Sequence, residues 1–104
     1  MADDGNGQPI FRLSLFPGVP AQIRALDEQA TARGIQDVFR AKLAEVNRRL
    51  QTNPREFGEP ASYYANAKLM VRHAALAPVY VRYAVHQEQS VVFVLEVKLL
   101  GAES

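Results

Sequence analysis

The chain has 104 residues, of which 48% are apolar and 22% are charged, and its formal net charge is +1. These values are typical of one globular domain with a single core, and they exclude a disordered chain. The absence of cysteine excludes a disulfide scaffold and a thiolate zinc site. The start, "MADDGNGQP", does not resemble a signal peptide, and no apolar run is long enough for a membrane helix, so we expect a cytoplasmic protein with no membrane partner.

The first part of the chain predicts a polar tail followed by a short strand. Residues 1–9 are polar and contain glycine, so we expect a disordered tail, with a second short tail over residues 101–104. Residues 10–100 then form a single domain. The segment "IFRLSLF", residues 10–16, alternates closely enough to be a strand, and "PGVP" at residues 17–20 ends it and begins a helix.

Two helices are predicted between residues 21 and 53. In residues 21–33 the apolar residues Ile23, Leu26 and Ala30 recur at helical spacing, and Gly34 is a plausible stop. The second helix carries an apolar stripe that consists of Ile35, Val38, Phe39, Leu43, Val46 and Leu50. Asn53-Pro54 ends this helix, because the residue before proline avoids helical geometry. A connection this short predicts an antiparallel helical hairpin.

The second half of the chain predicts three strands. Residues 54–66 contain two prolines and a glycine and are interpreted as a loop. Alternating segments then follow at residues 68–73, 79–86 and 90–100, with the polar "HQEQS" as a hairpin turn. A strand, a helical hairpin and three antiparallel strands predict an α+β domain of two layers, with the order β-α-α-β-β-β and an antiparallel-rich sheet.

Side-chain parity predicts which face of the terminal hairpin packs on the helices. If Val81, Tyr83 and Val85 share a side with Val91, Phe93 and Leu95, the hairpin centres near Glu88. The odd-numbered residues then face the helices and the even-numbered ones are bare. Tyr83 is expected in the core, with its hydroxyl bonded at the edge of the layer.

The order of these elements resembles the RelE/ParE superfamily of bacterial toxins. The residues that carry the resemblance are "L-x-x-NP" at residues 50–54 and the hairpin "VYVRYAVHQEQSVVFVLEV" at residues 79–97, and it covers roughly residues 11–100. The resemblance implies a RelE/ParE-like fold and a toxin-like component of a type II toxin–antitoxin module, the kind associated with plasmid stabilisation. It also implies a cognate antitoxin as partner, and either ribosome-bound mRNA or DNA gyrase as target.

The sequence departs from the family pattern where that family places its chemistry. Tyr80 stands where relatives carry an arginine, Leu100 stands where they carry another, and no aromatic residue follows it. Whether the chain is a metal-independent endoribonuclease therefore stays open. The alternative is a catalytically inactive protein-binding module on the same scaffold. A third alternative is a homodimer formed through exposed Val92 and Val94.

Candidate catalytic residues come from the even-numbered face and its neighbourhood. This face predicts a patch made of Lys68, Arg72, Tyr80, Arg82, Glu96 and Lys98. RNA cleavage without a metal needs a proton acceptor, a proton donor and cations for the charged phosphate. We assign phosphate binding to Arg72 and Arg82, a substitute cation to Lys98, and proton transfer to His73. The competing interpretation is a solvated face in which Glu96 neutralises its basic neighbours.

Three other features have both a functional and a structural interpretation. Basic residues outnumber acidic ones between residues 33 and 55, which indicates either a docking face or a solubilising helix surface. Tyr63 and Tyr64 either contact a partner or fold over the core. His86 is expected to be exposed beside the turn. No metal-ligand spacing, phosphate loop or dinucleotide fingerprint is present, so we expect no metal and no cofactor.

Overall fold

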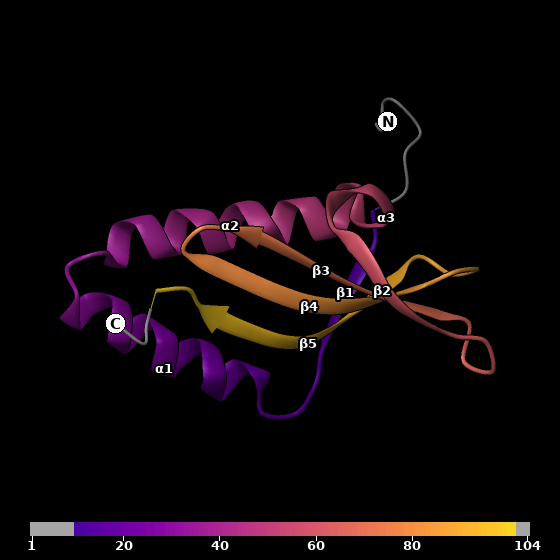
Figure 1. Cartoon of the computed structure of the whole chain (residues 1–104), viewed down its shortest axis with the longest axis horizontal. Helices are drawn as coiled ribbons and strands as arrows, with labels where there is room; N and C mark the ends of the chain where they lie inside the picture. Colours follow the sequence, from indigo (N-terminus) through magenta and orange to yellow (C-terminus); the bar gives the residue numbers. More distant parts are fainter. Residues whose placement is uncertain (1–9, 102–104) are drawn as a thin grey trace.

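The computed structural model describes residues 10–101 and has two layers, a five-stranded mixed sheet and a helical hairpin (Figure 1). Its elements are β1 (Arg12–Leu15), α1 (Val19–Ala32), α2 (Gln36–Thr52), α3 (Pro54–Phe57), β2 (Glu59–Tyr64), β3 (Leu69–Leu76), β4 (Val79–His86) and β5 (Val91–Leu99). The strand order is β1-β5-β4-β3-β2, with β1 parallel to β5 and the other pairs antiparallel. The predicted α+β class is confirmed. The predicted tail at residues 1–9 lies outside the described residues, as does all but Gly101 of the predicted tail at residues 101–104.

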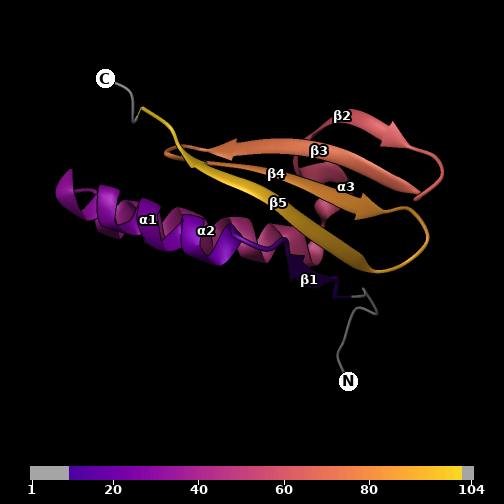
Figure 2. The same ribbon diagram turned by 90° about the horizontal axis from the view of Figure 1, so that it is seen from below.

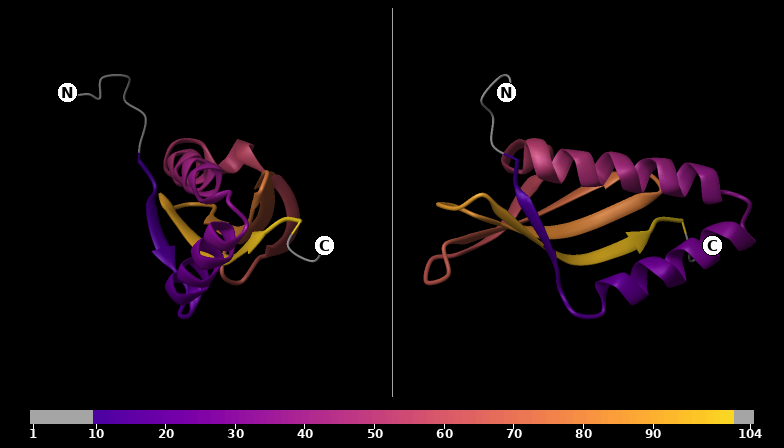
Figure 3. Two further views of the ribbon diagram at one scale, coloured as in Figure 1. Left: turned by 90° about the vertical axis from the view of Figure 1, so that its left-hand side faces the viewer. Right: turned by 180° about the vertical axis from the view of Figure 1, so that it is seen from behind.

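Both long helices cover the same face of the sheet (Figure 2), as the amphipathic stripes predicted, except that Val38 of the second stripe is exposed. Pro20 stands in the first turn of α1, where its missing N–H costs nothing. The turn between the helices contains Gly34 with a φ of 75°, a conformation that suits glycine. Asp27 and Arg40 join the helices through two hydrogen bonds of 2.9 and 3.0 Å. From that turn the helices diverge, so that they lie apart over the far part of the sheet (Figure 3).

The prediction of a loop over residues 54–66 is wrong. The segment forms the single turn α3 and then β2, which pairs with β3 and forms one edge of the sheet. Every residue of β2 is exposed, so no alternation of burial marks this strand in the sequence. The strand also contains Pro60 and a register shift between Pro60 and Ser62, features that belong to edge strands.

A bulge in β5 overturns half of the predicted side-chain parity. Arg82 pairs with Glu96, but Tyr83 pairs with Val94, so Leu95 is the extra residue. Between the bulge and the turn the even-numbered residues face the helices, and Val92 and Val94 are buried there. The predicted inward position of Phe93 is therefore wrong, as is the predicted exposure of Val92 and Val94, so these two residues are not available as a dimer contact.

On β4 the parity prediction holds, and Val81, Tyr83 and Val85 are all buried in the core. Tyr83 has no exposed surface, and its ring stacks on Phe57 with a centroid separation of 6.3 Å. Its hydroxyl donates to the carbonyl oxygen of Pro54 and accepts from the backbone N–H of Gly58, both at 3.0 Å. These two bonds hold α3 against the sheet. Among the described residues, no helix is long and apolar enough to cross a membrane.

Candidate functional site

The sheet face opposite the helices gathers three of the four predicted catalytic residues. The register places His73 beside Arg82, Arg82 beside Glu96, and Tyr80 beside Lys98, on the central strands β3, β4 and β5. Side chains of directly paired residues lie on the same face of a sheet. We call His73, Tyr80, Arg82, Glu96 and Lys98 the open-face cluster.

Charges within the open-face cluster are partly paired. The Nε of Arg82 donates to Glu96 over 3.4 Å, and the Nζ of Lys98 lies 3.7 Å from the same carboxylate. Lys98 also lies 5.7 Å from the ring centroid of Tyr80, which in turn is 6.1 Å from the His73 ring. The two cations outnumber the one carboxylate, and their side chains are 45% and 58% exposed. An incoming phosphate therefore meets two accessible cations beside two rings, at the cost of competing with Glu96.

Arg72 does not belong to this cluster, so its predicted place on the bare face is wrong. It pairs with Tyr83, which puts it on the helix-facing side of the sheet. Its Nη2 donates to the carbonyl oxygen of Gly58 over 2.5 Å, while its Nε is buried without a hydrogen-bond partner among the described residues. Burial raises the pKa of the Tyr83 hydroxyl, although the nearby Arg72 guanidinium opposes this change. Arg72 therefore has a structural role, because it binds the carbonyl oxygen of Gly58 at the end of α3.

The other basic residues are also distributed differently from the prediction. Lys68 occupies the turn between β2 and β3, with a φ of 56°, and its Nζ lies 2.8 Å from Glu88 in the turn between β4 and β5. On α2, the carboxylate of Glu45 pairs with both Arg48 and Arg49. These hydrogen bonds lower the pKa of Glu45 to about 2. The excess of basic residues between residues 33 and 55 is therefore reduced at the surface.

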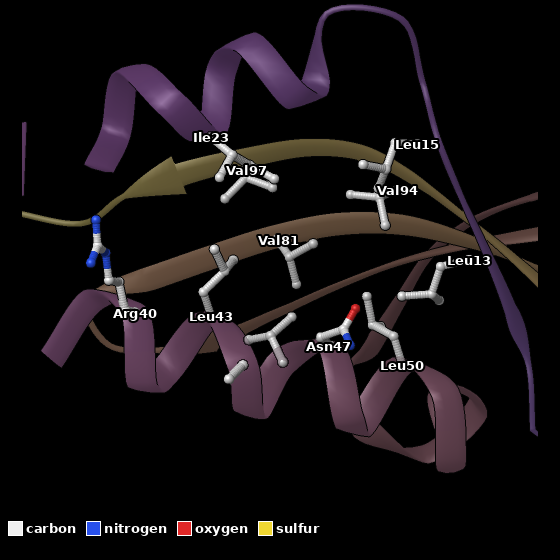
Figure 4. A pocket seen from close by; sticks show the side chains of 12 residues that line it. Leu13, Leu15, Ile23, Arg40, Leu43, Asn47, Leu50, Val81, Val94 and Val97 are labelled. Carbon is white, nitrogen blue, oxygen red and sulfur yellow. The ribbon is translucent and has the colours of Figure 1, made fainter. Parts of the chain in front are cut away.

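Sequence reasoning missed a second candidate site, an apolar groove between the diverging helices (Figure 4). It has a volume of about 420 Å³, a size that suits a ligand or an anchoring side chain. Its lining is mainly aliphatic and comes from β1, both long helices and the sheet: Leu13, Leu15, Ile23, Arg40, Leu43, Ala44, Val46, Asn47, Leu50, Val81, Val94 and Val97. The groove arises from the angle between α1 and α2, which no residue pattern encodes.

Tyr63 and Tyr64 lie at the surface, whereas the predicted exposure of His86 is wrong. Tyr63 and Tyr64 are 53% and 56% exposed on the edge strand β2, so they do not fold over the core. His86 is half-buried rather than exposed, because its Nδ1 accepts N–H bonds from Glu88 and Gln89, both at 3.1 Å. It therefore organises the hairpin turn.

Within residues 10–101, no group of three or more His, Cys, Asp or Glu side chains is arranged to hold a metal ion. Comparison of the chain with protein-family models, with curated proteins and with solved structures finds no match. The function must therefore be argued from the two candidate sites themselves.

Proposed function

We propose that this chain is the toxin-like component of a bacterial type II toxin–antitoxin module, which acts on mRNA at the ribosome or on DNA gyrase and is neutralised by a bound antitoxin. The observation that carries the proposal is the open-face cluster: a bare sheet face holds Arg82 and Lys98 beside His73 and Tyr80. The opposite face carries the helices and an apolar groove. One face is thus left for a target and the other for a partner.

The cluster contains the types of group that RNA cleavage needs. In that reaction the 2′-oxygen loses its proton to a base and attacks the neighbouring phosphorus, and the 5′-oxygen leaves with a proton from an acid. Histidine is the side chain that most often carries out such transfers in enzymes, so His73 is our candidate for one of them. Arg82 and Lys98 stabilise the extra negative charge on the phosphate oxygens.

A catalytically inactive protein-binding module is the second candidate, and one observation favours it. Glu96 pairs with both cations of the cluster, which weakens their attraction for phosphate. The apolar groove is unaffected by this pairing. In this case the groove carries the whole function, by receiving an apolar segment of a partner protein.

An inducible-expression growth assay in a bacterial host separates these functions. Arrest with cleaved transcripts supports the nuclease, and we expect Arg82→Ala and His73→Ala to abolish it while Arg48→Ala, a matched arginine change on α2, leaves it intact. Arrest with intact transcripts and a DNA-damage response supports action on gyrase. Unimpeded growth of cells that accumulate folded protein contradicts the toxin proposal and supports the binding module.

The proposed antitoxin is tested by co-expression with the product of any short open reading frame that adjoins the gene. We expect that product to restore growth if it encodes the antitoxin. Leu43→Asp places a charge among the aliphatic side chains of the groove, and we expect it to prevent the rescue while toxicity remains. Equal rescue of both forms excludes the groove as the binding site.

A further inference from the structure

One stretch of β3 has no strand neighbour on its outer side. The pairing of β2 with β3 ends at Glu59 and His73, because the chain turns away at Gly58 into α3. The strand β3 continues to Leu76 and remains paired with β4 over that distance. Residues 74–76 of β3 therefore form an open edge, which borders the open-face cluster at His73 and Tyr80 and is separate from the groove between the helices.

The backbone of Ala75 points outward at this open edge. The carbonyl oxygen of His73 points toward β2, since a β carbon at Gly58 would lie 2.3 Å from it. In an antiparallel strand, alternate residues direct their N–H and C=O groups to the same side. Ala75 therefore directs both groups away from β4, and its side chain is exposed. An N–H donor and a C=O acceptor with this spacing are the template for an added strand.

The open edge borders a hollow of about 430 Å³, a volume typical of ligand sites. Phe57 and Gly58 form one wall, and Leu76 and Tyr80 lie on the sheet side. The hydroxyl of Tyr83 on β4 is hydrogen-bonded to Gly58 and to Pro54 of α3. These bonds fix the wall of the hollow relative to the sheet. The hollow offers apolar contact next to the free backbone groups.

A cation with free donors also lines this hollow. The guanidinium of Arg49 lies 5.5 Å from the ring centroid of Phe57, and its Nε donates to Glu45. Its other N–H groups have no hydrogen-bond partner among residues 10–101. A guanidinium fork matches a carboxylate. Glu59 lines the β2 end of the hollow, so a bound carboxylate is expected at the Arg49 wall instead.

From these contacts we infer that the open edge binds an extended peptide segment of a partner protein. The segment adds a short strand beside residues 74–76, exchanges backbone hydrogen bonds with Ala75, and places a carboxylate against Arg49. The carboxylate belongs either to an acidic side chain or to a chain terminus. This inference does not depend on the toxin proposal, because Ala75 and Arg49, the two residues that carry it, lie outside the open-face cluster. His73 and Tyr80 only line the border of the hollow.

The test selects ligands for the full chain from a displayed library of random octapeptides. We expect the enriched peptides to be free of helix-forming patterns and to contain a carboxylate. Synthetic versions are then titrated into the protein, and amide hydrogen exchange is measured. Binding should slow the exchange of the Ala75 amide. Methylation of alternate peptide nitrogens should weaken binding about tenfold or more, because it removes backbone donors.

Matched variants locate the site. Ala75→Pro removes only the outward N–H, a change that edge strands tolerate, and it should abolish binding. Arg49→Gln should weaken binding about tenfold, whereas Arg48→Gln, which changes the other arginine bound to Glu45, should not. Peptides with free and amidated C-termini show which carboxylate is used.

The inference is overturned if no peptide is enriched, or if N-methylated peptides bind as tightly as their parents. That second comparison uses the unmodified protein, so it remains decisive even if Ala75→Pro destabilises the fold. A growth effect in the expression assay bears only on the proposed function, so the two proposals fail independently.

Discussion

The two faces of the sheet differ in burial and in charge, as two adjacent residues of β4 show. Val81, on the helix side, is 1% exposed, whereas Arg82, on the other side, is exposed and pairs with Glu96. The helix side is specified by apolar periodicity, and its side chains are buried in the core. The open side contains ion pairs and rings whose geometry depends on strand register. Stability should therefore respond to changes on one side and activity to changes on the other.

The largest expected effect of a single substitution comes from Phe39 on α2, which has no exposed surface. Phe39→Ala should lower the free energy of unfolding by about 3–5 kcal/mol, through lost apolar burial and the cavity that remains. Its neighbour Val38 is 48% exposed, and Val38→Ala should change stability by roughly 0.5 kcal/mol or less. Urea denaturation measures both. Similar losses for the two variants would contradict the assigned helix face.

A smaller loss is expected where α3 meets the sheet. A methyl group at Gly58 would lie 2.3 Å from the carbonyl oxygen of His73 and 2.9 Å from the hydroxyl of Tyr83. Gly58→Ala should therefore cost about 1–3 kcal/mol, because backbone has to move to accommodate it. Tyr83→Phe should cost a similar amount, about 1–3 kcal/mol, by leaving the partners of the hydroxyl unpaired. Neutral effects of both would mean that α3 is not held by these contacts.

Alkaline pH should weaken the same region. The folded-state pKa of Tyr83 is raised above its ordinary value of 10.0, chiefly by burial. The contribution of the protonated Tyr83 hydroxyl to the free energy of unfolding is fully present below the pKa of tyrosine in the unfolded chain. This contribution is lost as the pH rises from there through the pKa of Tyr83 in the folded protein. Denaturation at a series of pH values above 9 should show this decline, and tyrosine absorbance should show one late-titrating hydroxyl. Tyr83→Phe should remove that part of the decline.

The smallest effect is expected on the exposed side of α2. The pKa of Glu45 is lowered to about 2 by hydrogen bonds from Arg48 and Arg49. The contribution of the ionised Glu45 carboxylate to the free energy of unfolding is present above the ordinary carboxyl pKa. This contribution decreases as the pH falls below that value and is lost when the pH passes through about 2. Because all three side chains are at least one-third exposed, solvent screens the pairs, and Glu45→Gln should produce only a slight change in the acid limb of the stability profile. A large shift of the acid midpoint would contradict this assignment.

The sequence predicted what depends on apolar periodicity. The two long helices and the inward side chains of β4 were all indicated by spacing alone, as was the place of Tyr83. The exposed edge strand β2 lacked that signal, because none of its residues is buried. Alternation of apolar and polar residues also cannot reveal a β-bulge. The extra residue Leu95 reverses which side chains of β5 face the helices, so the burial of Val92 and Val94 was not predicted.

The candidate site was predicted in part for the same reason. Arg82, Lys98 and His73 share a face, but the position of Arg72 depends on its pairing with Tyr83, which alternation within one strand does not determine. The groove and the open edge of β3 were not predictable from the sequence. Both depend on where neighbouring elements diverge or end in space.

The parallel pairing of β1 with β5 joins the two extremes of the domain, since Leu13 lies beside Val92. We expect contacts between residues so distant in sequence to form late, because closing a long loop costs conformational entropy. During synthesis the helices emerge long before the strands that cover their apolar sides. A chain truncated before β5 would expose the apolar side chains of the helices to solvent. Such a chain is prone to self-association and is accessible to chaperones and proteases.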